Sequence, residues 1–336
     1  MEESPASMAY FSQVNHTRKG SGYTMADIQA LTREWQAPAL PESIPQGDMP
    51  GDKICITEEH RRKAETLFPK LKQLLWETLS HHPHQRAVVA VCGGSGVGKS
   101  EIASLLSYYL NQLGVGSYTL SGDNYPHRIP RDNDAERLRV FREGGLRGLI
   151  AAGVYTREIG DTLRELWTRD TDAQADVAED YPWLAVYQRA GRRSLGEYLG
   201  TEKEIDFRQV SDIIARFKQG EDSLPLKRMG RETTELWYDL VDVRQVRVLV
   251  IEWTHGNSDF IEGVDIPVLL NSTPAETLAH RRARNRDGKT DSAFTTMVLE
   301  LEQQKLDAQA HKAKLILSKA GELMDYREYR RRMADA

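Results

Sequence analysis

The chain of 336 residues is long enough for one large domain with insertions or for two domains. Its hydrophobic content of 40% supports a sizeable core, and its net charge of -5 excludes a global attraction for nucleic acid or an anionic membrane. No run approaches the ~20 apolar residues of a membrane-spanning helix, the first residues lack the pattern of a secretory signal, and two cysteines are too few for a disulfide framework. We therefore expect a cytoplasmic protein with neither a membrane nor a nucleic-acid partner.

Residues 1–52 are rich in Pro, Gly and Ser around one short helical stretch, MADIQALTREW. This composition predicts an arm that either stays mobile or packs over the body of the protein. From Thr57 onward, apolar residues recur with the spacing of one helical stripe, at Ala64, Leu67, Phe68, Leu71, Leu74, Leu75 and Leu79. We expect an amphipathic helix that Thr57 caps and that Pro69 can bend.

Five apolar runs have the length and composition of buried strands. They are 87–92, 117–122, 246–253, 265–272 and 313–319. Helical stretches separate them, and the long interval between the second and the third run is mostly helical. This order predicts an α/β fold of three layers, in which helices cover both faces of a mostly parallel five-stranded sheet. The predicted parts are an arm (1–52), a core (53–130 and 205–336) and a helical insert (131–204). We expect the insert to help bind the molecule on which the protein acts.

The first apolar run leads into GGSGVGKS, which fits the phosphate-loop pattern Gly-x-x-x-x-Gly-Lys-Ser between a strand and a helix. Glycines allow consecutive backbone N–H groups to face a bound phosphate, and the N-terminus of the next helix adds partial positive charge. We expect Lys99 to reach the β- and γ-phosphates of ATP and the Ser100 hydroxyl to hold Mg²⁺. The predicted ATP-binding residues of this segment are Gly93, Gly94, Ser95, Gly96, Val97, Gly98, Lys99, Ser100 and Glu101.

Two carboxylates follow apolar runs and are expected near the phosphate loop, because ligands of open α/β sheets bind beyond the carboxyl ends of the strands. Glu252 ends the run VRVLVIE and is predicted to hold Mg²⁺ directly or through water. Asp123 follows the run 117–122 and is predicted to accept the proton of an attacking hydroxyl and to be part of the metal site. The alternatives are that Glu252 only terminates a strand and that Asp123 only belongs to a turn.

At this point the chain resembles the uridine kinase and phosphoribulokinase superfamily, over 86–128 and 205–322. The segments GGSGVGKSEIA, LSGDNYPHR, VLVIEWTHG, HRRARNRDGK and AKLILSKAGE occur in the order of that superfamily's elements. The resemblance implies a phosphate-loop kinase fold and Mg²⁺-dependent transfer of the γ-phosphate of ATP to a hydroxyl of a small-molecule acceptor. It implies that Asp123 is the general base and that Glu252 is the superfamily's glutamate after the third strand. The substrate-side residues that it implies are Tyr125, Arg128 and Asp206.

The segment 280–291, HRRARNRDGKTD, resembles the mobile lid that closes over ATP in this superfamily. Its basic residues would neutralise charge on the transferred phosphoryl group and exclude water. They are Arg281, Arg282, Arg284, Arg286 and Lys289. Among them, Arg282 is predicted to bind ATP and Arg286 to act in catalysis. The alternative is a solvated charged helix face.

The acceptor is expected to be anionic. Nucleoside-phosphorylating members of the superfamily carry an aromatic cradle and a histidine where this chain has LPLKRMGRETTELWYD. Lys227, Arg228 and Arg231 stand there instead, and three basic residues fit an anionic metabolite better than a neutral nucleobase. A uridine or nucleoside kinase is therefore an alternative.

Two further alternatives remain at this stage. SGDNYPHRIPRDND, together with the GKSEIA part of the phosphate loop, also resembles adenylyl-sulfate kinase, although that family's sequence after the fourth strand does not occur here. A nucleotide-sensing P-loop protein would instead hydrolyse ATP slowly, without stimulation by an acceptor. The chain lacks the Asn-Lys-x-Asp tetrapeptide of switch GTPases and the Leu-Ser-Gly-Gly signature of ABC ATPases. A homo-oligomer is compatible with the sequence.

Overall fold

The computed structural model describes residues 28–273, 276–278 and 292–334, which form two compact units. The first unit comprises the described residues of Met1–Tyr125, Phe207–Thr273 and Ala308–Ala336, and the second those of Pro126–Asp206 and Pro274–Asp307. The second unit contains the segment predicted as a helical insert. It also includes the described part of 274–307, which the sequence does not mark as belonging with that insert.

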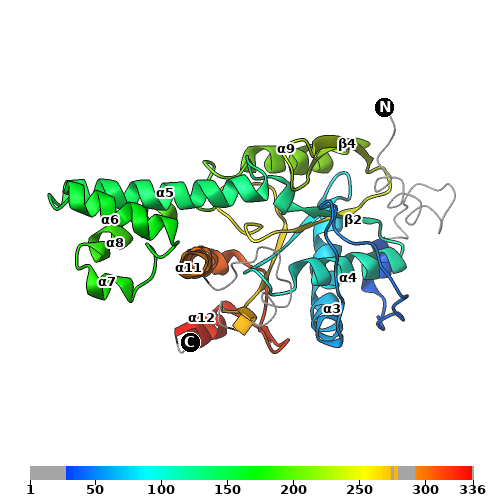
Figure 1. Cartoon of the computed structure of the whole chain (residues 1–336). Helices are drawn as coiled ribbons and strands as arrows, with labels where there is room; N and C mark the ends of the chain where they lie inside the picture. Colours follow the sequence, from blue (N-terminus) through cyan, green and yellow to red (C-terminus); the bar gives the residue numbers. More distant parts are fainter. Residues whose placement is uncertain (1–27, 274–275, 279–291, 335–336) are drawn as a thin grey trace. The chain divides into compact units, whose positions relative to one another are not determined.

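The first unit is built on a six-stranded sheet with the strand order β2-β5-β1-β6-β7-β8. Its strands are β1 (Ala87–Gly93), β2 (Ser117–Ser121), β5 (Val248–Glu252), β6 (Ile266–Leu270), β7 (Leu315–Leu317) and β8 (Leu323–Met324). The edge strand β2 is labelled in Figure 1. All five predicted runs form strands, and these five pair in parallel. The sixth strand, β8, is a two-residue addition antiparallel to β7, too short to carry a pattern of its own. Every residue of β1, β2 and β5 is buried, as in a parallel sheet covered on both faces.

Helices α3 and α4 join the sheet in the apolar core of this unit. The helical segments described in the first unit are η1 (Ala30–Thr32), α3 (Glu58–His81), α4 (Lys99–Gln112), η2 (Gly122–Asn124), α9 (Phe207–Lys218), η3 (Ala310–Lys312) and α12 (Tyr326–Ala334). Thr57 caps α3 as predicted, because its hydroxyl accepts a hydrogen bond from the backbone N–H of His60. Pro69 lies inside α3, which continues to His81.

The described part of the arm, from residue 28, packs on this core. The Trp35 ring lies 4.6 Å from the Phe68 ring and 5.1 Å from the Tyr109 ring, centroid to centroid. The Tyr108 hydroxyl donates to the carbonyl of Ala39 at 3.0 Å. Of the two states that the composition allows, the segment from residue 28 to 52 therefore adopts the packed one.

A β-hairpin lies within the interval that the sequence predicts as mostly helical. Strands β3 (Ser223–Met229) and β4 (Leu236–Asp242) pair antiparallel and form a separate two-stranded sheet. The prediction was wrong here because β3 contains Pro225 and two basic residues, so it lacks a continuous apolar run. In β4, the apolar side chains Leu236, Tyr238 and Leu240 alternate along the strand and are exposed.

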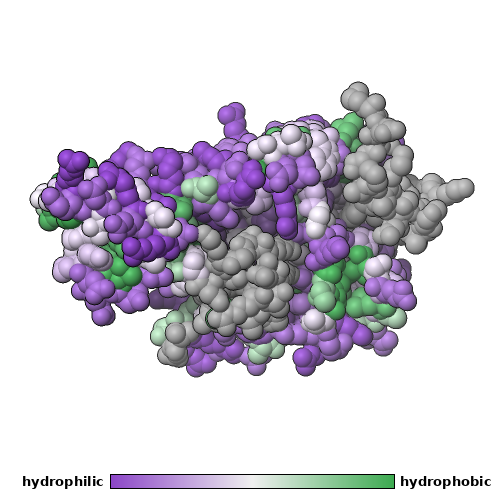
Figure 2. All heavy atoms as spheres, in the orientation of Figure 1, coloured by the Kyte–Doolittle hydropathy of each residue, from purple (hydrophilic) through white to green (hydrophobic). Residues whose placement is uncertain are grey.

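The second unit is helical. The helices with described bounds in this unit are α5 (Pro130–Ala151), α6 (Arg157–Thr168), α7 (Val177–Asp180), α8 (Leu184–Gly196) and all but the end of α11 (Ala293–Gln309). Their apolar core includes Phe141, Leu163, Leu184 and Leu301. None of the helices in the described part of the chain combines the length and the apolar composition that a bilayer crossing requires. The face drawn in Figure 2 is mostly hydrophilic, with hydrophobic residues in small separate areas.

Candidate functional site

The phosphate loop joins β1 to α4, as the sequence predicts. Gly98 has a φ of +94° and precedes the first residue of α4, so the loop needs a residue that accepts the left-handed region. A Cβ atom at Gly98 would also lie 2.9 Å from the His60 ring, which would have to shift to make room for it. The result is a turn whose backbone N–H groups and helix N-terminus can bind phosphate.

The Lys99 and Ser100 side chains lie at the start of α4. Lys99 Nζ donates to the carbonyl oxygen of Gly94 at 3.1 Å, so the ammonium group is held across the loop. Ser100 Oγ donates to Glu252 Oε2 at 3.0 Å. The phosphate loop and the predicted metal-side carboxylate are therefore in direct contact.

Glu252 is the last residue of β5, between the ends of two neighbouring strands. It lies opposite Val91 of β1 and Ser121 of β2 in the sheet register. Its Oε1 accepts a hydrogen bond from Ser121 Oγ at 2.5 Å, and the residue is 3% exposed. Burial, together with the negative charge of Asp123, raises the pKa of Glu252 to about 8. A carboxylate in this position favours a bound cation, because the positive charge would offset both the burial of Glu252 and the repulsion from Asp123.

Asp123 lies in the short helix η2 directly after β2. The preceding residue must be glycine, because a Cβ atom at Gly122 would lie 2.0 Å from the Trp253 indole. The flanking residues Gly122 and Asn124 are buried, whereas Asp123 is exposed. Close packing thus fixes the turn and leaves the Asp123 carboxylate accessible on the side of Glu252.

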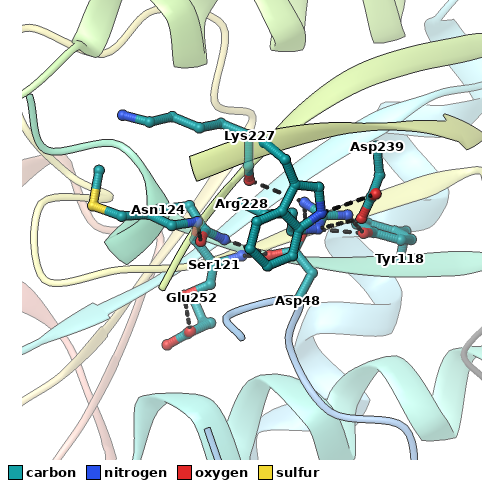
Figure 3. A network of polar contacts seen from close by, with 10 residues as sticks. Asp48, Tyr118, Ser121, Asn124, Lys227, Arg228, Asp239 and Glu252 are labelled. Carbon is teal, nitrogen blue, oxygen red and sulfur yellow. Dashed lines mark hydrogen bonds and ion pairs between the residues drawn. The ribbon is translucent and has the colours of Figure 1, made fainter. Parts of the chain in front are cut away.

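The sequence gives no indication of a third acidic residue near this turn, Asp48 of the arm. Asp48 Oδ1 accepts from the Ser121 N–H at 2.7 Å and from Asn124 Nδ2 at 3.2 Å (Figure 3). Its Oδ2 accepts from the Tyr118 hydroxyl and from Arg228 Nη1, both at 2.9 Å. Burial raises the pKa of Asp48, and the positive charge of Arg228 opposes that rise. Asp48 stands in a Pro- and Gly-rich stretch, IPQGDMPGDK, that carries only a turn signal.

Arg228 is predicted to bind the acceptor, but its guanidinium group contacts protein groups on every nitrogen. Nε donates to Asp239 Oδ2 at 3.0 Å, Nη1 to Asp48 and Nη2 to the Tyr118 hydroxyl at 2.9 Å. The residue is 6% exposed. Lys227 extends away from this cluster in Figure 3, and Arg231 is exposed beyond the end of β3. The three basic residues therefore do not share one environment.

The remaining predicted residues are spread over the chain. Tyr125 is fully buried, and burial raises the pKa of its hydroxyl. Glu101 is also buried, in the first turn of α4. Arg128 belongs to the second unit, where Nη1 donates to the Tyr198 hydroxyl at 3.1 Å, and Asp206 belongs to that unit as well. The predicted lid residues, Arg282 and Arg286 among them, lie outside the described residues.

The described residues hold no group of three or more His, Cys, Asp and Glu side chains suited to a metal. The carboxylates of Glu252 and Asp123 and the hydroxyl of Ser100 are nevertheless oxygen ligands, which Mg²⁺ prefers, and Mg²⁺ normally keeps several waters and binds substrate phosphates as well. These residues thus fit a magnesium ion that a bound triphosphate helps to hold.

No family model matches this chain. A bifunctional alpha-galactosidase/sucrose kinase, AgaSK, from Mediterraneibacter gnavus is 39% identical over 276 residues, which make up 80% of this chain. The chain spans about a quarter of that relative, 24% of its length. Adenylyl-sulfate kinase from Escherichia coli K12 is 41% identical over 68 residues, 19% of this chain and 34% of that protein. The solved structure of a presumed fructose transport system kinase from Silicibacter sp. TM1040 superposes with a TM-score of 0.42 at 16% identity, over 76% of this chain and 96% of that chain.

Proposed function

We propose that this chain, a P-loop kinase-like protein by its motifs and its fold, transfers the γ-phosphate of ATP to a hydroxyl group of a small molecule. The observation that carries the proposal is the contact between Ser100 at the end of the phosphate loop and the buried Glu252, with Asp123 at the end of the neighbouring strand. A phosphate-binding loop, a metal-side carboxylate and an accessible base are the groups that phosphoryl transfer requires.

In the proposed reaction, the loop N–H groups and Lys99 bind the β- and γ-phosphates. Ser100 and Glu252 would hold Mg²⁺, which would neutralise charge on the phosphate oxygens. The Asp123 carboxylate accepts the proton of the acceptor hydroxyl while the hydroxyl oxygen bonds to the γ-phosphorus. The bond from the γ-phosphorus to the bridging oxygen breaks, and ADP leaves. Arg282 and Arg286 would add positive charge at this stage, as the resemblance to lid-bearing kinases implies.

We propose a sugar as the acceptor, and sucrose as the first to be tested. Two observations support a neutral acceptor. The relative that matches 80% of this chain is named as a sucrose kinase. In addition, Arg228, which the sequence predicts to recognise a negative charge, is neutralised by Asp48 and Asp239. A small anionic metabolite is the second candidate, because the basic residues Lys227 and Arg231 could bind its negative charge. Adenylyl sulfate is the third, since the partial match to adenylyl-sulfate kinase favours it.

The test is an ADP-release assay on the purified protein with ATP, Mg²⁺ and one acceptor at a time. The acceptors are neutral sugars with sucrose, sugar phosphates, polyols, nucleosides and adenylyl sulfate. Phosphorus NMR of the product locates the new phosphate, and Lys99→Ala supplies the background rate. Stimulated ADP release with an equal amount of phosphorylated product supports the proposal. Slow ADP release that no acceptor stimulates would refute it in favour of a nucleotide-sensing protein.

A further inference from the structure

The strap, defined as residues 46–54 of the arm, is an ordered loop. Gln46 closes it, because Nε2 donates to the carbonyl of Asp52 at 2.6 Å and Oε1 accepts from the Ile54 N–H at 3.3 Å. A Cβ atom at Gly47 would lie 3.5 Å from Glu252 Oε1. The strap therefore passes directly over the buried carboxylate, and its next residue is Asp48.

The two carboxylate oxygens of Asp48 face two different parts of the site. One oxygen binds the Ser121 N–H and the Asn124 amide, which flank Asp123 on either side. The other binds Tyr118 of β2 and Arg228 of the hairpin. Figure 3 shows these side chains converging on Asp48 from the arm, β2 and β3. Asp48 is thus the point at which three separate stretches of sequence meet.

The same contacts reach the two carboxylates of the proposed reaction. Ser121, which Asp48 holds through its N–H, donates its hydroxyl to Glu252. Asn124 is held from the other side as well, because its Oδ1 accepts from the Met229 N–H at 3.0 Å. Shifting this turn would therefore move Asp123 and remove a hydrogen bond from Glu252 at the same time.

We propose that Asp48 is a positioning residue for phosphoryl transfer. It fixes the turn that carries Asp123 and, through Ser121, the orientation of Glu252. The inference rests on the proposed function, because that function gives Asp123 and Glu252 their roles. A misplacement of about 1 Å at a reacting group can lower the reaction rate about 100-fold. A residue that holds this turn in place can therefore affect the rate without contacting the substrate.

The test variant is Asp48→Asn, which keeps the shape of the side chain. Both oxygens of Asp48 accept hydrogen bonds, whereas the amide of Asn has only one oxygen. Its NH₂ group must therefore face donor groups in place of one of the two oxygens, and the hydrogen bonds of that oxygen are lost. With the best acceptor, kcat should fall at least ~10-fold, and KM for ATP should change less than kcat, because Lys99 and the N–H groups of the phosphate loop still bind the phosphates.

Asp265→Asn is the matched control. Like that of Asp48, its carboxylate accepts from a backbone N–H and from a basic side chain of the same unit, here the Val88 N–H at 2.8 Å and Lys218 Nζ at 2.6 Å. Val88 lies near the start of β1, at the opposite end of that strand from the phosphate loop. This control should lose thermal stability to a similar extent and keep kcat within about twofold of wild type. An unchanged kcat in Asp48→Asn, or an equal loss in both variants, overturns the inference.

Hydrogen–deuterium exchange gives a readout that does not require kinase activity. The Ser121 N–H should lose protection in Asp48→Asn and keep it in Asp265→Asn. Unchanged protection in Asp48→Asn contradicts the anchoring role even if the kinase assay succeeds. If the wild-type protein phosphorylates no acceptor, the proposed function fails, and exchange alone decides whether Asp48 holds the turn. If Asp48→Asn does not fold, Asn124→Ala loosens the same turn while leaving the Asp48–Arg228 ion pair, and it should show the same selective loss of kcat.

Discussion

At the scale of single residues, the carboxylates of Asp123 and Glu252 have different surroundings, and we assign them different roles. Glu252 is buried and contacts the phosphate loop, whereas Asp123 is exposed after a turn that packing holds in place. The hydroxyl of a bound acceptor can reach an exposed carboxylate, which suits the role of a base. The two residues should therefore respond differently to substitution.

Asp123→Asn should lower kcat at least ~100-fold, the lower range for a lost general base, and leave ATP binding nearly intact. Steady-state kinetics with the identified acceptor and calorimetric titration with Mg-ATP measure both quantities. Lys99→Ala is the contrast, since it should weaken ATP binding as well. A large loss of Mg-ATP affinity in Asp123→Asn would show instead that Asp123 serves the metal.

The residues of the site differ in how far the sequence reveals them. Lys99 and Ser100 lie in a contiguous motif, and Glu252 and Asp123 end apolar runs, so pattern and strand order predict that they meet. Asp48 has no such signal, because its partners Tyr118 and Arg228 are distant in the chain and only the folded structure brings them together. The sequence also predicts nothing of the pairing that neutralises Arg228.

At the scale of secondary structure elements, the first turn of α3 holds an ion cluster. Glu59 Oε1 accepts from Lys63 Nζ at 2.6 Å and from Lys319 Nζ at 3.3 Å, which ties the helix to the segment after β7. The hydrogen bond from Lys63 lowers the pKa of Glu59 to about 2. A carboxylate whose pKa is lowered on folding stabilises the protein above its unfolded pKa, and this contribution is lost as the pH falls through the folded value.

Glu59→Gln should therefore destabilise the protein at pH 7, by about 1 kcal/mol, because partial exposure of the side chain screens the pair. The difference in Tm between wild type and variant should shrink below pH ~4.5 and approach zero near pH 2. Thermal unfolding between pH 7 and pH 3 measures this trend. Glu65→Gln, which breaks the more exposed pair with Arg61 on the same helix, is the control and should change Tm little. A Tm difference that stays constant down to pH 3 would contradict the assignment.

The elements that the sequence predicts well are those with long apolar runs. Four of the five strands of the parallel sheet are rich in Val, Ile and Leu, and the fifth, β2, is buried along its whole length although it contains Ser and Thr. The β3–β4 hairpin is missed because it is stabilised by cross-strand contacts, such as Arg228 opposite Trp237, and carries charge where an isolated strand would be apolar. β8 is missed because two residues are too few to show any periodicity.

At the scale of the whole molecule, the chain forms two units that the sequence only partly separates. The helical segment between the second and third predicted strands is recognisable by its periodicity. That the described part of 274–307 belongs to the same unit is not recognisable, because its contacts with that segment are distant in sequence. Each unit has its own apolar core, so a destabilising substitution should affect mainly the stability of the unit that contains it.

The second unit depends on a buried ion cluster around Glu204. This fully buried side chain accepts from Arg137 Nε at 2.5 Å, Asn133 Nδ2 at 3.0 Å and the Gly200 N–H at 2.5 Å. Glu204→Gln should destabilise this unit by about 3–5 kcal/mol, because it leaves Arg137 without its main counter-charge. Hydrogen–deuterium exchange should accelerate in peptides from Pro126–Asp206.

Glu143→Gln is the control for this experiment, since it breaks exposed pairs on α5 with Arg139 and Arg147. It should cost less than about 1 kcal/mol and leave exchange in the unit nearly unchanged. Equal acceleration in both variants would show that the buried cluster has no special role. Faster exchange in β1 and α4 alone would show that Glu204 stabilises the first unit, and it would contradict the prediction.

The order of strands in the sheet has a consequence for the biosynthesis of the protein. β1 lies between β5 and β6, and both of these come after the whole of Pro126–Asp206 in the chain. While the ribosome is still adding α5 to α8, those helices can already form, since helices rely on local contacts. β1 has no neighbouring strand at that time, and its apolar residues stay accessible to chaperones or to other nascent chains. A nascent chain stalled before Val248 therefore contains the complete phosphate-loop sequence but lacks the strands that would hold it in a shape able to bind nucleotide.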